Sequence, residues 1–133
     1  MKLVFADAFD FIALLNADDA AHARAGEFTQ GYSGQYVTTT VTLIELADAF
    51  SRPSSRQAAG RFLDDLPASK AMRIVHINEE LFQVGLDLYL ARQDKDWSLT
   101  DCISFVVMQR EGITEALTGD KHFEQAGFVA LLK

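Results

Sequence analysis

Residues 98–120, SLTDCISFVVMQREGITEALTGD, contain the pattern that decides the fold. Apolar residues with helical spacing predict a helix over residues 99–110, with Asp101 in its first turn. A short β-type segment follows at 116–118, and Asp120 comes directly after it. The stretch therefore predicts a helix that leads into a strand, with one aspartate near the start of the helix and another just after the strand.

The rest of the chain alternates between short β-type segments and longer helical patterns. Further strands are expected at residues 2–6, 36–39, 73–77 and 128–132. Helices are expected at residues 8–15, 18–30, 41–51, 54–66 and 78–92, with a helical turn at 121–125. This alternation predicts an α/β fold of three layers (α/β/α), in which helices cover both faces of a central parallel sheet of four to five strands.

The length and composition predict a single domain that spans residues 1–133. The chain has 133 residues, and 49% of them are hydrophobic, which is enough for one core. Its single cysteine, Cys102, has no partner for an internal disulfide, and its apolar stretches are far shorter than the roughly 20 residues of a membrane-spanning helix. Because its first residues do not read as a signal peptide, we expect a cytoplasmic protein that is not in the membrane.

The net charge limits how the chain can bind nucleic acid. Twelve basic and 19 acidic residues give a formal charge of −7, which argues against binding through a broad basic surface. A nucleic acid can still be the substrate, because cations bound among clustered carboxylates reverse the local sign of the charge.

Four acidic residues stand at positions that predict one shared site. Asp7 follows the first expected strand and Asp120 follows the strand at 116–118. Ligands of open parallel sheets bind beyond the carboxyl ends of the strands, so these two side chains are expected at the same edge. Asp101 lies in the first turn of its helix. Glu45 lies in the apolar run VTLIELADAF, where an unpaired charge would be costly to bury.

The four carboxylates have two interpretations. Each stands where it can cap a helix, with Thr42 and Ser98 as capping-box partners of Glu45 and Asp101. If they converge, they form a site for Mg²⁺ or Mn²⁺, since hard cations prefer carboxylate and water oxygens. Such a site suits phosphodiester hydrolysis, because a metal activates water and neutralises charge on the phosphoryl oxygens. The spacing supports a metal site but names no substrate.

The sequence resembles the PIN-domain nucleases, most closely the VapC-type toxins of toxin–antitoxin pairs. The resemblance runs through FADAF (5–9), TLIELADAF (42–50), DWSLTDCISFVVMQREGI (96–113) and ALTGDKHFEQAGF (116–128). It implies that the catalytic and metal-binding residues are Asp7, Glu45, Asp101 and Asp120. It also implies a Mg²⁺- or Mn²⁺-dependent endoribonuclease that acts on RNA, forms a homodimer and is inhibited by a cognate antitoxin.

The resemblance also indicates two secondary positions and one departure. Thr118 stands where the family has a hydroxyl, so it could orient Asp120 or contact substrate, although a threonine at a strand end is also unremarkable. His122 is a candidate phosphate contact. The family often has Thr or Ser after the first aspartate, whereas this chain has Ala8, with an additional acid at Asp10, so a hydroxyl contact is absent there but no metal ligand is lost.

Two alternatives remain open. One is a PIN-like module that has lost catalysis and only binds partners, although all four carboxylates are present. The other is a phosphoryl-accepting receiver domain, which has a similar length, sheet and acidic site. The receiver class requires an aspartate at the end of the third strand, where this chain has Asn78 and Glu79.

Overall fold

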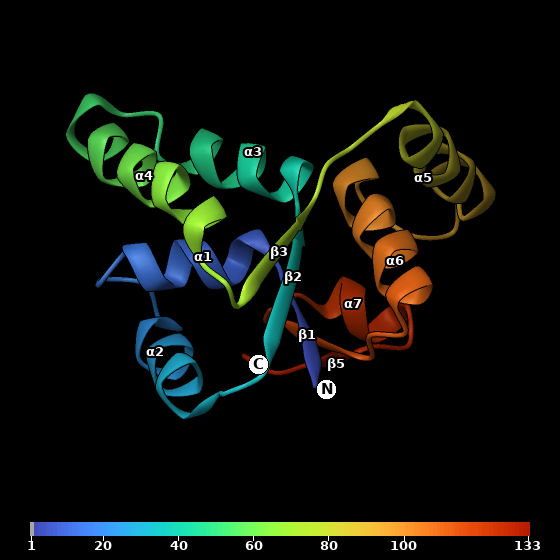
Figure 1. The fold of residues 1–133 in the computed structure, drawn as a ribbon. Helices are drawn as coiled ribbons and strands as arrows, with labels where there is room; N and C mark the ends of the chain where they lie inside the picture. The colour runs from blue at the N-terminus through green and yellow to red at the C-terminus, as the bar shows by residue number, and fades with distance from the viewer. Residues whose placement is uncertain (1) are drawn as a thin grey trace.

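The computed structural model describes residues 2–133 and contains a five-stranded, all-parallel sheet (Figure 1). The strands are β1 (Leu3–Ala6), β2 (Gln35–Thr39), β3 (Met72–Val75), β4 (Glu115–Leu117) and β5 (Val129–Ala130). Their order across the sheet is β3-β2-β1-β4-β5. β1 is thus central, and its neighbours are β2 and β4. The carboxyl ends of β1 and β4 lie side by side, because Ala6 is paired with Leu117.

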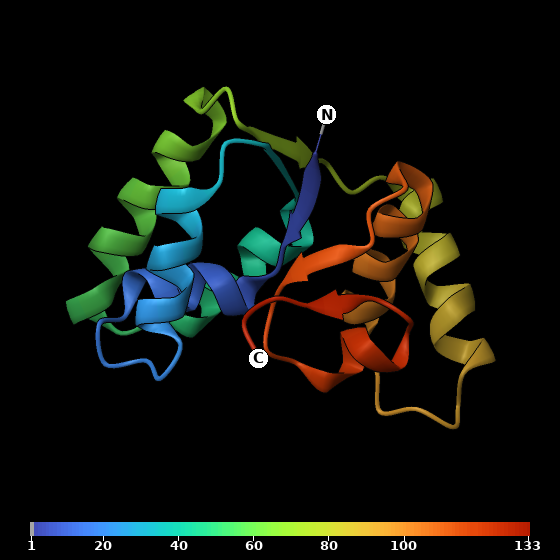
Figure 2. The same cartoon turned by 90° about the horizontal axis from the view of Figure 1, so that it is seen from below.

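Helices cover both faces of the sheet, as the sequence predicts. One layer comprises α1 (Ala8–Leu15), α2 (His22–Gly31), α3 (Thr40–Ala49) and α4 (Pro53–Asp65), which is followed by the 3₁₀ helix η1 (Leu66–Ala68). The other comprises α5 (Glu79–Ala91), α6 (Leu99–Glu111) and α7 (Lys121–Gln125). Figures 1 and 2 show these two groups on opposite sides of the strands. The three-layer α/β/α prediction is confirmed.

The core is divided between the two faces of the sheet by the alternation of β1. Phe5 packs into the cluster under α5, α6 and α7, whereas Val4 and Ala6 pack into the cluster under α1 to α4. Successive strand residues point to opposite faces, so one strand supplies both cores. Within α6 every residue from Cys102 to Met108 is buried. Among residues 2–133, no helix is long and apolar enough to cross a membrane.

Three local predictions need correction. The helix predicted at 18–30 begins only at His22, because Asn16 and Asp19 accept hydrogen bonds from nearby backbone N–H groups and hold residues 16–21 in turns. The strand predicted at 128–132 is shorter and covers only Val129–Ala130. α3 is capped by Thr39, whose hydroxyl accepts from the Thr42 N–H, so the predicted capping box with Thr42 was wrong.

Candidate active site

A buried hydroxyl joins the ends of the two central strands. Thr118, just past β4, donates a hydrogen bond from Oγ1 to Asp7 Oδ2 over 2.9 Å. The same oxygen accepts one from the backbone N–H of Asp120 at 3.1 Å. Thr118 is fully buried, so both bonds are shielded from water. The threonine that the sequence left open therefore orients Asp7 directly and holds the backbone of Asp120 beside it.

Asp101 is placed by the start of α6. The Ser98 hydroxyl accepts from the Asp101 N–H, and Asp101 Oδ2 accepts from the Ser98 N–H at 3.2 Å, which completes the predicted capping box. The same Oδ2 lies 3.0 Å from Nδ1 of His122. Asp101 therefore has two roles in one conformation, because its carboxylate both caps a helix and faces the acidic site.

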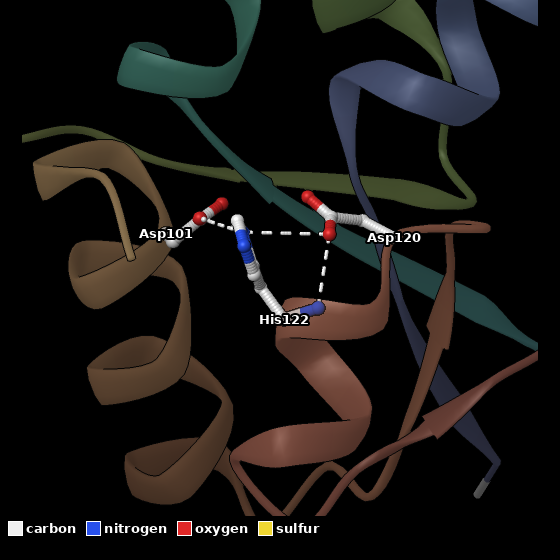
Figure 3. A group of neighbouring side chains, drawn as sticks. All are labelled: Asp101, Asp120 and His122. Carbon is white, nitrogen blue, oxygen red and sulfur yellow. Dashed lines mark hydrogen bonds and ion pairs between the residues drawn. The ribbon is translucent and has the colours of Figure 1, made fainter. Parts of the chain in front are cut away.

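His122 bridges two of the predicted acids, as Figure 3 shows. Its Nδ1 lies 3.0 Å from Asp101 Oδ2 and 3.4 Å from Asp120 Oδ1. Asp120 Oδ1 also accepts the His122 backbone N–H at 2.9 Å, so it caps α7, as predicted. Within residues 2–133, one oxygen of each aspartate and one ring nitrogen of His122 all lie within 4.8 Å of one another. This trio is compact enough to share one ion.

Asp7 and Glu45 lie outside that compact trio, but the charges of its aspartates affect their pKa values. The negative charges of Glu45 and Asp101 both raise the pKa of Asp7. Partial loss of solvation is the largest cause that raises the pKa of Glu45, and the charges of Asp101 and Asp120 raise it further. The structure thus brings all four predicted acids to one edge of the sheet, with Asp101 and Asp120 the closest together. Glu45 avoids the cost of burying an unpaired charge, because its part of α3 faces solvent.

The charged forms of Asp7 and Asp101 are disfavoured. Burial is the largest cause that raises the pKa of Asp7 to about 7, and the bond from Thr118 acts in the opposite direction. Burial and the charge of Asp120 also raise the pKa of Asp101, against the hydrogen bond from Ser98 and the effect of His122. A cation placed among these groups would stabilise their charged forms.

Asp10 is a further buried acid whose environment the sequence did not predict. It lies one turn along α1 from Asp7 and is 2% exposed. Its Oδ1 has no hydrogen-bond partner, and burial followed by the charge of Asp7 raises its pKa to about 7. Only the spacing from Asp7 could have signalled this position, because residues three apart share a helix face.

A match to the PIN domain family covers residues 4–129. This range includes the carboxyl ends of β1 and β4, where the acids lie. The chain belongs to the PIN-domain family. The resemblance described from the sequence is therefore confirmed, and the match spans the elements that carry all four acids.

This PIN domain is similar to characterised relatives. It is 28% identical over 127 residues to the 23S rRNA-specific endonuclease VapC20 of Mycobacterium tuberculosis, and the match covers 96% of each chain. The crystal structure of VapC20, described as a sarcin–ricin loop cleaving toxin, superposes with a TM-score of 0.87 at 27% identity, covering 96% of this chain and 97% of that one.

Two more distant structures share the fold. A toxin–antitoxin complex from Klebsiella pneumoniae has a TM-score of 0.67 at 17% identity and covers 96% of this chain and 97% of its own. FitAcB from Neisseria gonorrhoeae has a TM-score of 0.71 at 15% identity and covers 96% of this chain and 94% of its own.

The donor set of this PIN domain fits a hard divalent cation. Carboxylate oxygens are the ligands that Mg²⁺ and Mn²⁺ prefer, and an imidazole nitrogen is acceptable to Mn²⁺ but uncommon for Mg²⁺. Asp101, Asp120 and His122 provide such atoms within one small volume. Burial, followed by repulsion from neighbouring carboxylates, raises the pKa values of Asp7 and Asp101, and a bound cation would stabilise their charged forms.

Proposed function

We propose that this PIN domain is a metal-dependent endoribonuclease, and that it serves as the toxin of a toxin–antitoxin pair. The observation that carries the proposal is the convergence of Asp101, Asp120 and His122 within 4.8 Å at the edge where Asp7 is held by Thr118. That convergence is more than capping requires, because four acids from four separate segments repel one another unless a ligand compensates.

Asp7, Glu45, Asp101 and Asp120 would hold Mg²⁺ or Mn²⁺ at this edge. When bound, such an ion supplies a water of lowered pKa and neutralises negative charge on the phosphoryl group. The residues of the chain position these groups: Thr118 fixes the rotamer of Asp7, and the capping box fixes Asp101. Preorganised ligands of this kind act without a costly rearrangement at the moment of reaction.

His122 has a role beyond the phosphate contact expected from the sequence. Its imidazole lies between two carboxylates that would otherwise repel each other. We assign it as a positioning residue that keeps Asp101 and Asp120 at a spacing suited to one ion. Its neighbour Lys121 is exposed at the start of α7, where a cation can meet an approaching phosphate.

The relatives suggest where to look for substrate and partners. The printed description of VapC20 names 23S rRNA and the sarcin–ricin loop, so ribosomal RNA is the first substrate to test for this chain. The fold shared with toxin–antitoxin complexes supports a protein antitoxin as its inhibitor. We further propose a homodimer that acts in the cytoplasm, where ribosomes are available.

Incubation of the purified chain with intact ribosomes and with an unstructured RNA tests this proposal. Cleavage at defined sites is expected with Mg²⁺ or Mn²⁺ and should stop with EDTA or in Asp7→Asn. Asp64→Asn, which changes an exposed acid on α4, is the matched control and should cleave normally. Equal cleavage by Asp7→Asn and the unchanged chain would refute the proposal. Absence of cleavage with every divalent metal and RNA would favour a non-catalytic binding module.

A further inference from the structure

An open hollow lies beside the acidic edge, between the end of α5 and the start of α6. Its volume is about 930 Å³, and apolar and polar groups both contribute to its walls. The residues that matter here are Tyr89 and Leu90 on α5, Arg92 and Lys95 in the connecting turn, and Trp97 and Ser98 before α6. None of these side chains belongs to the proposed metal site.

Ser98 connects the hollow to the acidic site. It lines the hollow, and its backbone N–H donates to Asp101 Oδ2 over 3.2 Å. That same oxygen lies 3.0 Å from the His122 ring. One end of a ligand bound in the hollow would therefore lie next to Asp101, at the proposed site of cleavage.

Of the two aromatic rings in the hollow, one is exposed and the other is buried. Tyr89 is 45% exposed although it is a large hydrophobic side chain, and Leu90 beside it is 54% exposed. Trp97 is only 6% exposed, its Nε1 donates to Gln125 Oε1, and the Arg92 guanidinium lies 5.0 Å from its ring centroid. Tyr89 is thus the ring free to stack on a ligand, whereas Trp97 forms part of the floor.

The charges of the hollow leave one available cation. Arg92 forms two hydrogen bonds to Asp94. The guanidinium and the carboxylate therefore neutralise each other's charge. Asp96 is the acid in the wall, and Asp94 is not part of it. Lys95 forms no salt bridge among residues 2–133, and it stands between Tyr89 and the acidic edge in the chain. An exposed aromatic ring and an ammonium group that line one hollow are groups that bind single-stranded nucleic acid.

We propose that this hollow binds the single-stranded RNA segment that flanks the cleaved bond, with a base stacked on Tyr89 and a backbone phosphate on Lys95. The inference rests on the proposed function, because it assigns the substrate-binding surface of that same site. It explains how a chain with a net charge of −7 holds RNA, since the strand contacts one ring and one cation instead of a broad basic face.

Trp97 makes the hollow observable, because it is the only tryptophan in the chain. Titration with a ten-nucleotide uridine RNA, in EDTA and again with Ca²⁺, should change its fluorescence as the hollow fills. Tyr89→Ala and Lys95→Ala should each weaken binding roughly tenfold, the scale of one stacked base. Phe82→Ala is matched to Tyr89→Ala, since both rings are 45% exposed on α5, and Lys70→Ala is matched to Lys95→Ala. Neither control should alter affinity.

Cleavage measured on the same variants separates the two proposals. If the chain cleaves RNA and Tyr89→Ala and Lys95→Ala raise KM while kcat is kept, both proposals stand. If cleavage is normal in both variants, or if the controls weaken binding equally, the hollow is not the RNA surface and the proposed function survives. If the oligonucleotide binds through Tyr89 but no divalent metal supports cleavage, the proposed function fails instead. RNA binding that leaves Trp97 unchanged overturns the inference.

Discussion

Thr118 holds Asp7 in the acidic site by a hydrogen bond of 2.9 Å from its hydroxyl to Asp7 Oδ2. The contact joins residues 111 positions apart, and it exists because β1 and β4 are parallel neighbours whose carboxyl ends coincide. Ala8, which follows the first aspartate, has no hydroxyl to offer. In this chain Asp7 therefore receives its side-chain hydroxyl contact from the neighbouring strand.

Replacement of Thr118 by valine keeps the shape of the side chain and removes the hydroxyl. Because that bond lowers the pKa of Asp7 against the effect of burial, its loss should raise the pKa further. We expect kcat for RNA cleavage to fall by about 10- to 100-fold, and the rising limb of the pH–rate profile to move to higher pH. Thr118→Ser should restore both. A profile unchanged in shape would assign Thr118 a packing role only.

His122→Ala should weaken divalent metal binding by about tenfold, measured by calorimetric titration with Mn²⁺. The imidazole lies between Asp101 and Asp120, so its loss leaves the two carboxylates without a group that holds them at one spacing. His76→Ala, at an exposed position outside the site, is the control and should bind Mn²⁺ normally. Tighter Mn²⁺ binding by His122→Ala would mean that the imidazole competes with the ion instead.

Asp10→Asn should change how stability depends on pH. The folded pKa of about 7 lies above the ordinary aspartate pKa of 3.8, so the stability associated with protonated Asp10 is complete below about pH 4 and is lost as the pH rises through 7. Each pKa unit corresponds to ~1.4 kcal/mol. On going from pH 5 to pH 8, the free energy of unfolding of the variant should therefore increase by a few kcal/mol relative to that of the unchanged chain.

Urea unfolding in EDTA at pH 5 and at pH 8 measures this difference in the free energy of unfolding. Asp64→Asn, an exposed acid on α4, should show no such gain. If Asp10→Asn and the unchanged chain lose stability in parallel from pH 5 to pH 8, Asp10 is not buried as the structure describes.

Gly85→Ala should destabilise the contact between α5 and α6. A Cβ at this position would lie 2.5 Å from Ile103 Cγ1 and 3.4 Å from its Cα, so Ile103 must shift. Overpacking of this kind costs about 1–3 kcal/mol, which exceeds the gain of up to ~1 kcal/mol in helix propensity. Gly26→Ala on α2, where the new Cβ meets nothing within 4 Å, should be neutral or stabilising by the same urea measurement. Equal stability of the two variants would contradict the described packing.

The elements best predicted from the sequence are those with local signals. α6 begins at a capping box and ends at Gly112, whose φ of 68° is left-handed, so both ends are encoded within a few residues. In the region before α2, a local signal led to a wrong prediction. Asp19 reads as the acidic start of a helix, but its side chain bonds to the N–H of Ala21 and makes a turn instead.

The sequence predicted that the four acids lie at one edge of the sheet, but it did not predict how they are arranged there. Strand-end positions identified Asp7 and Asp120 as neighbours, because that follows from parallel topology. The approach of Asp101 to His122 depends on how α6 packs against α7, which no local pattern contains. Glu45 lies in an apolar run, yet neighbouring Ile44 is 58% exposed, so the apolar flanks alone do not indicate which face of α3 is buried.

Anomalous X-ray scattering from crystals soaked in Mn²⁺ tests the central claim most directly, because it locates the ion without relying on activity. The account predicts a peak about 2.0–2.2 Å from carboxylate oxygens of Asp101 and Asp120, within reach of Asp7, that is lost in Asp101→Asn crystals. A protein that cleaves RNA with Mn²⁺ but shows no peak among these carboxylates, or retains the peak in Asp101→Asn, would contradict it.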